Sequence, residues 1–261
     1  MRRSGLVGLG LVLVVSAVGL GFAWRWFERG PGRPSVSAAI GRFRTSTTVG
    51  TATNTSTPRP GVYLYKGAGS GSLSFLATRQ EQGPIEPGTV VVRPNGCWEF
   101  RIDFNSFHDQ TWERCRTNSK LVESGGRTDQ RFDFVTFKMS EHSTVTCDPP
   151  IVAADANDKP GTTSRVHCTG RSQTTKTTFA QTGVSTFVGR EAVLVGGVSI
   201  PGLHTREDML LSGGQTGVVR VDIWFAASDG LPLKEVTASR SFHRHRLRSI
   251  TSPTPRSGVG N

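Results

Sequence analysis

Two pairs of acidic residues are the best candidates for catalytic residues in this chain. If residues 98–104 and 108–115 form an antiparallel hairpin, Glu99 lies opposite Glu113 and Asp103 lies opposite Asp109. Paired carboxylates can act as an acid and a base, or can hold a cation. The alternative is a solvated polar face whose repulsion is offset by neighbouring arginines. We favour the second interpretation and predict no catalytic residue.

The neighbouring arginines are Arg101 and Arg114. A register shifted by two residues would also separate the like charges while keeping the same faces, so two registers remain open.

Metal and nucleophile motifs are incomplete elsewhere. His243 and His245 share one face of a basic segment and could bind a transition metal, but no third ligand is assigned to them. Residues 155–157 mimic the start of a calcium loop, which then fails because Lys159 and Pro160 replace an oxygen ligand and the glycine. No G-x-S-x-G or H-E-x-x-H motif occurs. The sequence therefore predicts no metal, no cofactor and no enzymatic activity, with a hydrolase as the less favoured alternative.

The four cysteines indicate an oxidising compartment. They are Cys97, Cys115, Cys147 and Cys168, and none forms a C-x-x-C motif. Four cysteines allow three pairings, and the nearest-neighbour pairing is favoured by the strands around them. We therefore expect disulfides Cys97–Cys115 and Cys147–Cys168 in an exported domain.

Residues 98–104 have the pattern of a strand with one apolar face. Trp98, Phe100, Ile102 and Phe104 alternate with charged residues, a period of two. If Cys97 lies opposite Cys115, Phe100 falls opposite Trp112 on the apolar face. This hairpin then places its aromatic side chains in the core.

The second half of the chain predicts a β-meander. Strands are expected over 192–195, 203–211, 218–225 and 231–237, with turns at Gly196-Gly197, Gly213-Gly214 and Asp229-Gly230. Flanking strands are expected at 143–147 and 164–168, around a turn-rich insert. The fold class is mainly β: a curved antiparallel sheet, half-barrel or open barrel-like, after one N-terminal transmembrane helix.

The transmembrane helix is expected over residues 4–24, which carry no charge. Such a span is about 31 Å long as a helix, close to the bilayer core. The alternative is a cleavable signal peptide with small residues at 15–17. Flanking charges on the two sides nearly balance, so the cysteines decide the orientation and place the C-terminal part outside the cytoplasm.

Four regions follow from these patterns: a membrane anchor or signal sequence (1–29), a Ser/Thr/Pro-rich linker (30–60), an extracytoplasmic β domain (61–250) and a disordered tail (251–261). Within the linker, 35–44 could form a short helix capped by Ser35 or Ser37. The net charge of +11 suits anionic lipid or an anionic envelope polymer as partners outside the membrane, rather than nucleic acid.

Two resemblances add to this interpretation. The first rests on Val221-Asp222-Ile223-Trp224-Phe225 and Gly230-Leu231-Pro232-Leu233-Lys234, which resemble the strand-turn-strand of the LolA/LppX-like lipoprotein carriers and their sigma-factor-regulator relatives. That group has curved sheets over a hydrophobic ligand cavity, and no catalytic residue is carried over. A lipid-modified N-terminal cysteine is absent here.

The second resemblance spans most of the predicted domain. It rests on segments 61–65, 96–98, 112–115, 187–191 and 195–197, which are similar to an uncharacterised exported, membrane-anchored family of high-GC Gram-positive bacteria. It implies a location and no activity. Together the observations predict a single-pass, non-catalytic protein of the cell membrane that binds an apolar or lipid-like ligand. The alternative is an envelope scaffold or sensor that binds protein or an anionic wall polymer.

Overall fold

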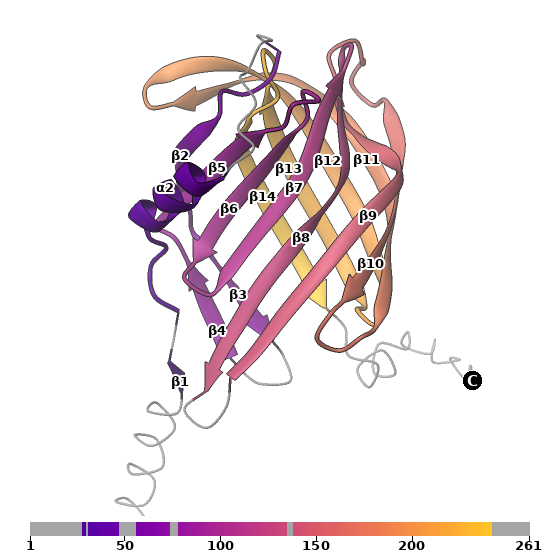
Figure 1. The fold of residues 1–261 in the computed structure, drawn as a ribbon. Helices are drawn as coiled ribbons and strands as arrows, with labels where there is room; N and C mark the ends of the chain where they lie inside the picture. The colour runs from indigo at the N-terminus through magenta and orange to yellow at the C-terminus, as the bar shows by residue number, and fades with distance from the viewer. Residues whose placement is uncertain (1–27, 30, 47–55, 74–77, 135–137, 242–261) are drawn as a thin grey trace, which may run out of the picture.

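The protein is a mainly antiparallel β structure (Figure 1). The computed structural model describes residues 28–29, 31–46, 56–73, 78–134 and 138–241. Segments 4–24 and 242–261 therefore lie outside the described residues, and so do the expected transmembrane helix, the His243/His245 pair and the predicted tail. Within the described ranges, no helix has the length and apolar character needed to cross a bilayer.

One large sheet contains twelve of the strands. Its members are β1 (Glu28–Arg29), β2 (Gly61–Lys66), β5 (Ile85–Val92), β6 (Trp98–Asn105), β7 (His108–Thr117), β8 (Lys120–Phe134), β9 (Lys138–Asp155), β10 (Thr163–Ser172), β11 (Thr178–Val195), β12 (Val198–Gly213), β13 (Gly217–Ala226) and β14 (Pro232–Ser241). A separate two-stranded sheet pairs β3 (Gly69–Leu73) with β4 (Thr78–Gln82).

The large sheet is a meander that curls on itself. From β5 to β14 each strand pairs with the next one along the chain, and β2 pairs with β5 at the far edge. The curl brings the two edge strands together at one end, where the Tyr65 hydroxyl of β2 donates to the Pro232 carbonyl of β14 (2.8 Å). No ladder joins β2 to β14 among the described residues, so the half-barrel is open along this side.

Glycines permit the close approach of neighbouring strands. A Cβ on Gly126 would lie 2.2 Å from the Thr111 carbonyl oxygen of β7, and one on Gly183 would lie 2.0 Å from the Asp208 carbonyl oxygen of β12. Any side chain here would push the adjacent backbone away. These two positions therefore need glycine for the sheet to keep its tight curl.

The inner face of the curl holds the main core. Its central side chains alternate along each strand as the sequence pattern predicts, with Phe100 paired to Trp112. The buried members are Val90, Val92, Trp98, Phe100, Ile102, Leu121, Ala153, Ala154, Phe187, Leu203, Val221, Ile223 and Phe225. The turn after β13 covers one end of this core, because Gly230 lies against Leu121 and Trp98.

The disulfides join neighbouring strands. Cys97 is bonded to Cys115, and Cys147 is bonded to Cys168 directly across the β9–β10 ladder. This is the nearest-neighbour pairing expected from the sequence. Cys147 and Cys168 are buried on the inner face with Ile151.

The region between the second pair is more regular than the sequence suggests. The expected turn-rich insert is mostly strand, since β9 continues to Asp155 and β10 begins at Thr163. A register shift in β8–β9 accommodates the two prolines after Asp148. Likewise β11 and β12 extend as a two-stranded arm over 189–201, which turns at Gly196-Gly197 and projects beyond the sheet (Figure 1).

Helix α2 (Val36–Thr45) lies within the predicted linker. Ser35 is its N-cap, accepting a hydrogen bond from the Ala38 amide, as the sequence allows. Ala39 is fully buried where α2 contacts β2 and β5, and Arg42 forms an ion pair with Asp103 of β6. This part of the linker is therefore packed on the outer face of the sheet.

Candidate functional site: the inner face of the curled sheet

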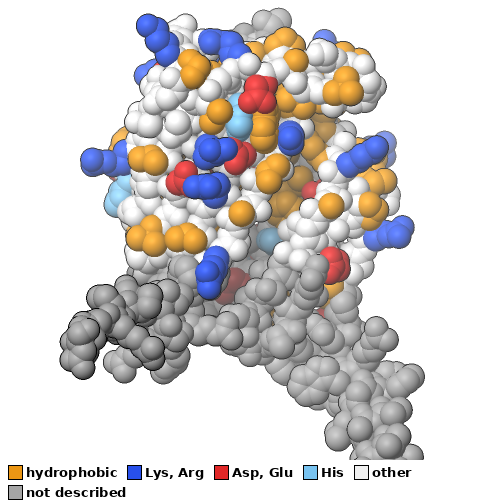
Figure 2. Space-filling view, turned by 180° about the vertical axis from the view of Figure 1, so that it is seen from behind, with side chains coloured by type: hydrophobic (Ala, Val, Ile, Leu, Met, Phe, Trp, Pro, Cys, Tyr) orange, Lys and Arg blue, Asp and Glu red, His pale blue; other side chains and the backbone are white. Residues whose placement is uncertain are grey.

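The inner face is only partly covered by the protein itself. Several of its apolar side chains pack against the core yet keep accessible surface: Tyr63, Tyr65, Phe104, Trp112, Met209 and Val219. Figure 2, seen from the side of β13 and β14, shows a hollow with hydrophobic side chains at its floor. The strand that borders the opening, β14, presents polar and exposed Glu235, Thr237 and Ser239 on this same face. The inner face is thus an apolar surface with a polar edge.

A single arginine lies deep inside the curl. Arg114 of β7 is 1% exposed and its Nε and Nη2 both lie 3.0 Å from Glu123 Oε2. Its guanidinium carbon lies over three aromatic rings, 5.1 to 5.8 Å from their centres, which belong to Phe100, Trp112 and Phe225. The Nη1 atom has no hydrogen-bond partner among the described residues. The cation is therefore held by one carboxylate and an aromatic cage, with one donor group unused.

Further carboxyl groups surround this arginine. Burial raises the pKa of Glu207 to about 8, with a further contribution from the charge of Glu123. Burial also raises the pKa of Glu235, although its side chain is accessible from the hollow. Glu86, beside Tyr65, has its pKa raised to about 7 by burial and by Glu235. Arg114 thus interacts with three carboxyl groups, those of Glu123, Glu207 and Glu235, and protonation of Glu207 near neutral pH removes one of the negative charges.

The β3–β4 hairpin crosses the inner face near the β6–β7 turn. Gln80 of β4 donates to the Arg131 carbonyl (2.8 Å) and accepts from Gln130 Nε2 (3.1 Å). Beside it, burial lowers the pKa of His108 to about 4, so that this imidazole is neutral at physiological pH. Gln80 and Gln130 therefore place polar, uncharged side chains at this end of the inner face.

A small pocket lies at the opposite end. It has a volume of about 160 Å³ and is bordered by the end of β9, the start of β10, the middle of β11 and β12, and the start of β8. Its floor carries three hydroxyl groups, from Ser164, Ser185 and Thr205, and its wall carries Phe187. Thr205 is 2% exposed, and its Oγ1 has no hydrogen-bond partner among the described residues. This pocket therefore contains an unused polar group in an otherwise covered position.

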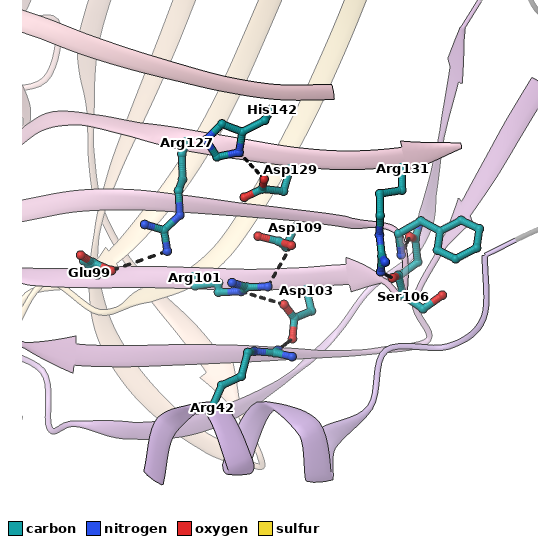
Figure 3. Close-up of polar contacts among 12 residues, drawn as sticks. Arg42, Glu99, Arg101, Asp103, Ser106, Asp109, Arg127, Asp129, Arg131 and His142 are labelled. Carbon is teal, nitrogen blue, oxygen red and sulfur yellow. Dashed lines mark hydrogen bonds and ion pairs between the residues drawn. The ribbon is translucent and has the colours of Figure 1, made fainter. Parts of the chain in front are cut away.

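The acidic pairs expected from the sequence lie on the outer face, where Figure 3 shows Asp103 and Asp109 together with Glu99. The structure adopts the unshifted register, with Glu99 opposite Glu113 and Asp103 opposite Asp109. Arg101 binds both Asp103 (3.0 Å) and Asp109 (2.9 Å).

The compensating cation at the other pair differs from the expected one. Arg93 bridges Glu99 and Glu113, whereas Arg114 points inward. The expectation for Arg114 was wrong because it shares the inner face with its cross-strand partner Trp98. Each carboxylate of these pairs has an arginine partner, which offsets the repulsion between like charges. Burial nevertheless raises the pKa of Asp109 to about 6.

A histidine on the outer face has carboxylates on both sides. His204 Nδ1 lies 2.8 Å from Glu191 and its Nε2 lies 2.8 Å from Asp222. Its ring stacks on Trp224, whose indole N–H donates to Glu191 (3.0 Å) and lowers the pKa of that carboxyl together with His204. Because both ring nitrogens already face carboxylates, this imidazole has no free nitrogen with which to accept a proton from a nucleophile. The cluster fastens the base of the β11–β12 arm to β13.

The outer face also carries an open groove of about 550 Å³. Threonines from β9, β10 and β11 border it, and Arg171 is a cationic residue among its lining. No set of three or more His, Cys, Asp or Glu side chains in the described ranges is arranged to hold a metal ion.

Sequence reasoning missed the inner polar groups. The only available signal is the alternation of side chains along a strand. Thr205 and Glu207 alternate in step with Leu203 and Met209, so all four side chains lie on the same face. It also gave His142 and His204 no partners, whereas the structure pairs His142 with Asp129. These contacts join residues of different strands and are not visible in local spacing.

Comparison with protein-family models, curated proteins and solved structures found no match.

Proposed function

We propose that the inner face of the curled sheet binds an apolar, lipid-like ligand in the cell envelope. The observation that carries this proposal is the hollow beside β14, where aromatic and aliphatic side chains of the inner face remain accessible. Accessible apolar surface of this kind favours an apolar partner, because water is released when it is covered.

The open side of the half-barrel supports a long ligand rather than a compact one. The two edge strands meet through the Tyr65–Pro232 contact at one end, and no ladder closes the remainder among the described residues. A chain-like molecule can enter sideways through such an opening. The two disulfides support an oxidising location for this activity, as expected for a domain outside the cytoplasm.

A matched pair of tryptophan substitutions on β13 tests the proposal. Val219 lies on the inner face and Val218, its neighbour, is 45% exposed on the outer face. We expect Val219→Trp to fill part of the hollow and to weaken binding of a fluorescent dodecanoyl probe at least ten-fold. Val218→Trp should bind the probe as the unaltered protein does.

A second pair of substitutions, on β14, provides the same test in case Val219→Trp disturbs folding. Thr237 faces the hollow and is exposed, while Val236 is 51% exposed on the outer face. Thr237→Trp should weaken binding and Val236→Trp should not. The proposal fails if the unaltered protein binds no probe and carries no lipid in native mass spectrometry, or if inner and outer variants behave alike.

A second candidate is a scaffold that binds an envelope polymer through the outer groove. The groove's row of threonine hydroxyls and Arg171 favours a hydroxylated or weakly anionic chain. Co-sedimentation with purified wall polymer, compared between the unaltered protein and Arg171→Glu, distinguishes this candidate, since Arg171 is exposed on the outer face and does not line the hollow.

A further inference from the structure

We propose that the 160 Å³ pocket lined by Ser164, Ser185 and Thr205 binds the polar head of the ligand, and that this head is a neutral, glycerol-like polyhydroxyl group. The inference rests on the proposed function, because it assigns the head group of the same ligand whose apolar part lies on the inner face.

The pocket is built from the inner face of adjacent strands. Ser185 pairs with Ser164 of β10, and Thr205 of β12 pairs with Phe187 of β11. Ser185 and Thr205 are 3% and 2% exposed. The Ser164 hydroxyl donates to the Val152 carbonyl (3.3 Å), which leaves its oxygen able to accept. Three hydroxyl groups are therefore held around one small space.

The unpartnered Thr205 Oγ1 is the observation that points to a ligand. A buried polar group without a partner costs free energy, so most such groups in native proteins are satisfied. Thr205 lines the pocket, and a hydroxyl group placed there can both accept its proton and donate to its lone pairs. A ligand with hydroxyl groups supplies what the site lacks.

The size and charge of the pocket select the class of head group. A volume of 160 Å³ corresponds to the liquid volume of about five water molecules, which suits a three-carbon polyol. The floor is uncharged, and the rim carries Lys120 with Asp155 and Asp158. A buried anion would face two aspartates, and the hydroxyl-lined floor offers no counter-charge to an ion of either sign, whereas a neutral polyol requires none.

Along the strands the inner face changes from polar to apolar. The pair next to Thr205 and Phe187 is Glu207 and Ser185, and the following pair is Met209 and Gly183. The raised pKa of Glu207 keeps this position mostly neutral at pH 7. A head in the pocket would therefore be followed by neutral polar groups and then by the apolar lining.

The test uses probes that share one tail and differ in the head. Isothermal titration of the full-length protein would compare monododecanoylglycerol, methyl dodecanoate and the dodecanoate anion, with dodecyl glucoside as a larger polyol. We expect monododecanoylglycerol to bind more tightly than the methyl ester and the anion. Dodecyl glucoside should bind more weakly than monododecanoylglycerol, because a sugar is larger than a three-carbon polyol; tighter binding of the glucoside would overturn the assignment of a glycerol-sized head.

Two threonine-to-valine variants assign the effect to the pocket. Thr205→Val keeps the side-chain shape and removes the unpartnered hydroxyl; Thr182→Val is the control, since Thr182 pairs with Leu210 on the outer face. Thr205→Val should weaken the binding of monododecanoylglycerol about five-fold and leave the binding of the methyl ester unchanged. It should not lower the melting temperature of the ligand-free protein, because the hydroxyl makes no bond there.

The outcomes separate the two proposals. If no probe with a dodecyl tail binds, the proposed function fails. If the methyl ester binds as tightly as monododecanoylglycerol, or if Thr205→Val and Thr182→Val behave alike, the pocket does not hold the head and this inference is overturned while the apolar site remains.

Discussion

Arg114 is the residue that most strongly constrains the interior. A buried guanidinium is costly unless other groups compensate its charge, and here Glu123 and three aromatic rings do so. The remaining acidic groups, Glu207 and Glu235, have pKa values raised by burial. The interior can therefore change its charge within the physiological range of pH.

We expect this protonation to appear as a pH dependence of stability. The pKa of Glu207 is about 8 in the folded protein, against about 4.3 for an unfolded glutamate. The folded state retains a proton that the unfolded state has lost, so its contribution is complete below the unfolded pKa and disappears as pH rises through 8. The free energy of unfolding should fall by roughly 1 kcal/mol between pH 7 and pH 8.

Urea unfolding at pH 7 and pH 8 measures this slope, and Glu207→Gln serves as the comparison. The window avoids His108, whose pKa of about 4 gives the opposite dependence at lower pH, with stability rising from pH 4 to about 6.5. Glu86, with a pKa of about 7, titrates within the window, so Glu207→Gln should keep a smaller slope of the same sign. An equal slope in the unaltered protein and in Glu207→Gln would contradict the assignment.

At the scale of single elements, the strands are positioned by glycine as much as by apolar side chains. We predict that Gly183→Ala destabilises the fold by about 1–3 kcal/mol, because its Cβ would lie 2.0 Å from the Asp208 carbonyl oxygen and would displace β12.

Gly41→Ala in α2 is the control substitution for Gly183→Ala. Nothing lies within 4 Å of a Cβ at this exposed helical position, so the substitution should stabilise by about 0.5 kcal/mol through helix propensity. Thermal unfolding of both variants measures the contrast; a Gly183→Ala variant that is as stable as the unaltered protein would mean that β12 does not approach β11 as closely as described.

The local alternation of apolar and polar residues was sufficient to predict several of these elements. Alternation from Trp98 predicted the inward face, and the register that puts Glu99 opposite Glu113 was one of the two that the sequence left open. Alternation was insufficient for the contacts of Arg114 and His204, because their carboxylate partners lie on neighbouring strands and the contacts depend on the register between those strands. The floor of the small pocket has the same origin, since Ser164, Ser185 and Thr205 belong to three strands.

At the scale of the whole molecule, the two disulfides lie in different environments. Cys147 and Cys168 are 4% and 1% exposed within the inner face, whereas Cys97 and Cys115 are half-buried near the end of a hairpin. We predict that a mild reductant opens Cys97–Cys115 first, because thiol–disulfide exchange needs access to a sulfur atom.

Alkylation during a time course of reduction, followed by peptide mass spectrometry, measures this order. The second bridge should open only with loss of the native near-ultraviolet circular dichroism. Early labelling of Cys147 or Cys168 in protein that is still folded would show that the inner wall opens locally.

The meander also determines how this chain can acquire its structure. From β5 onward every strand finds its partner in the segment just made, so pairing can proceed step by step from the N-terminal side without waiting for a distant strand. The last two strands, β13 and β14, carry Phe225 and the turn that covers Trp98 and Leu121. Until they arrive, the first hairpins expose their aromatic side chains to solvent. A chain truncated before β13 should therefore form paired strands and aggregate, and a chaperone acting on this protein would be needed most at that stage of synthesis.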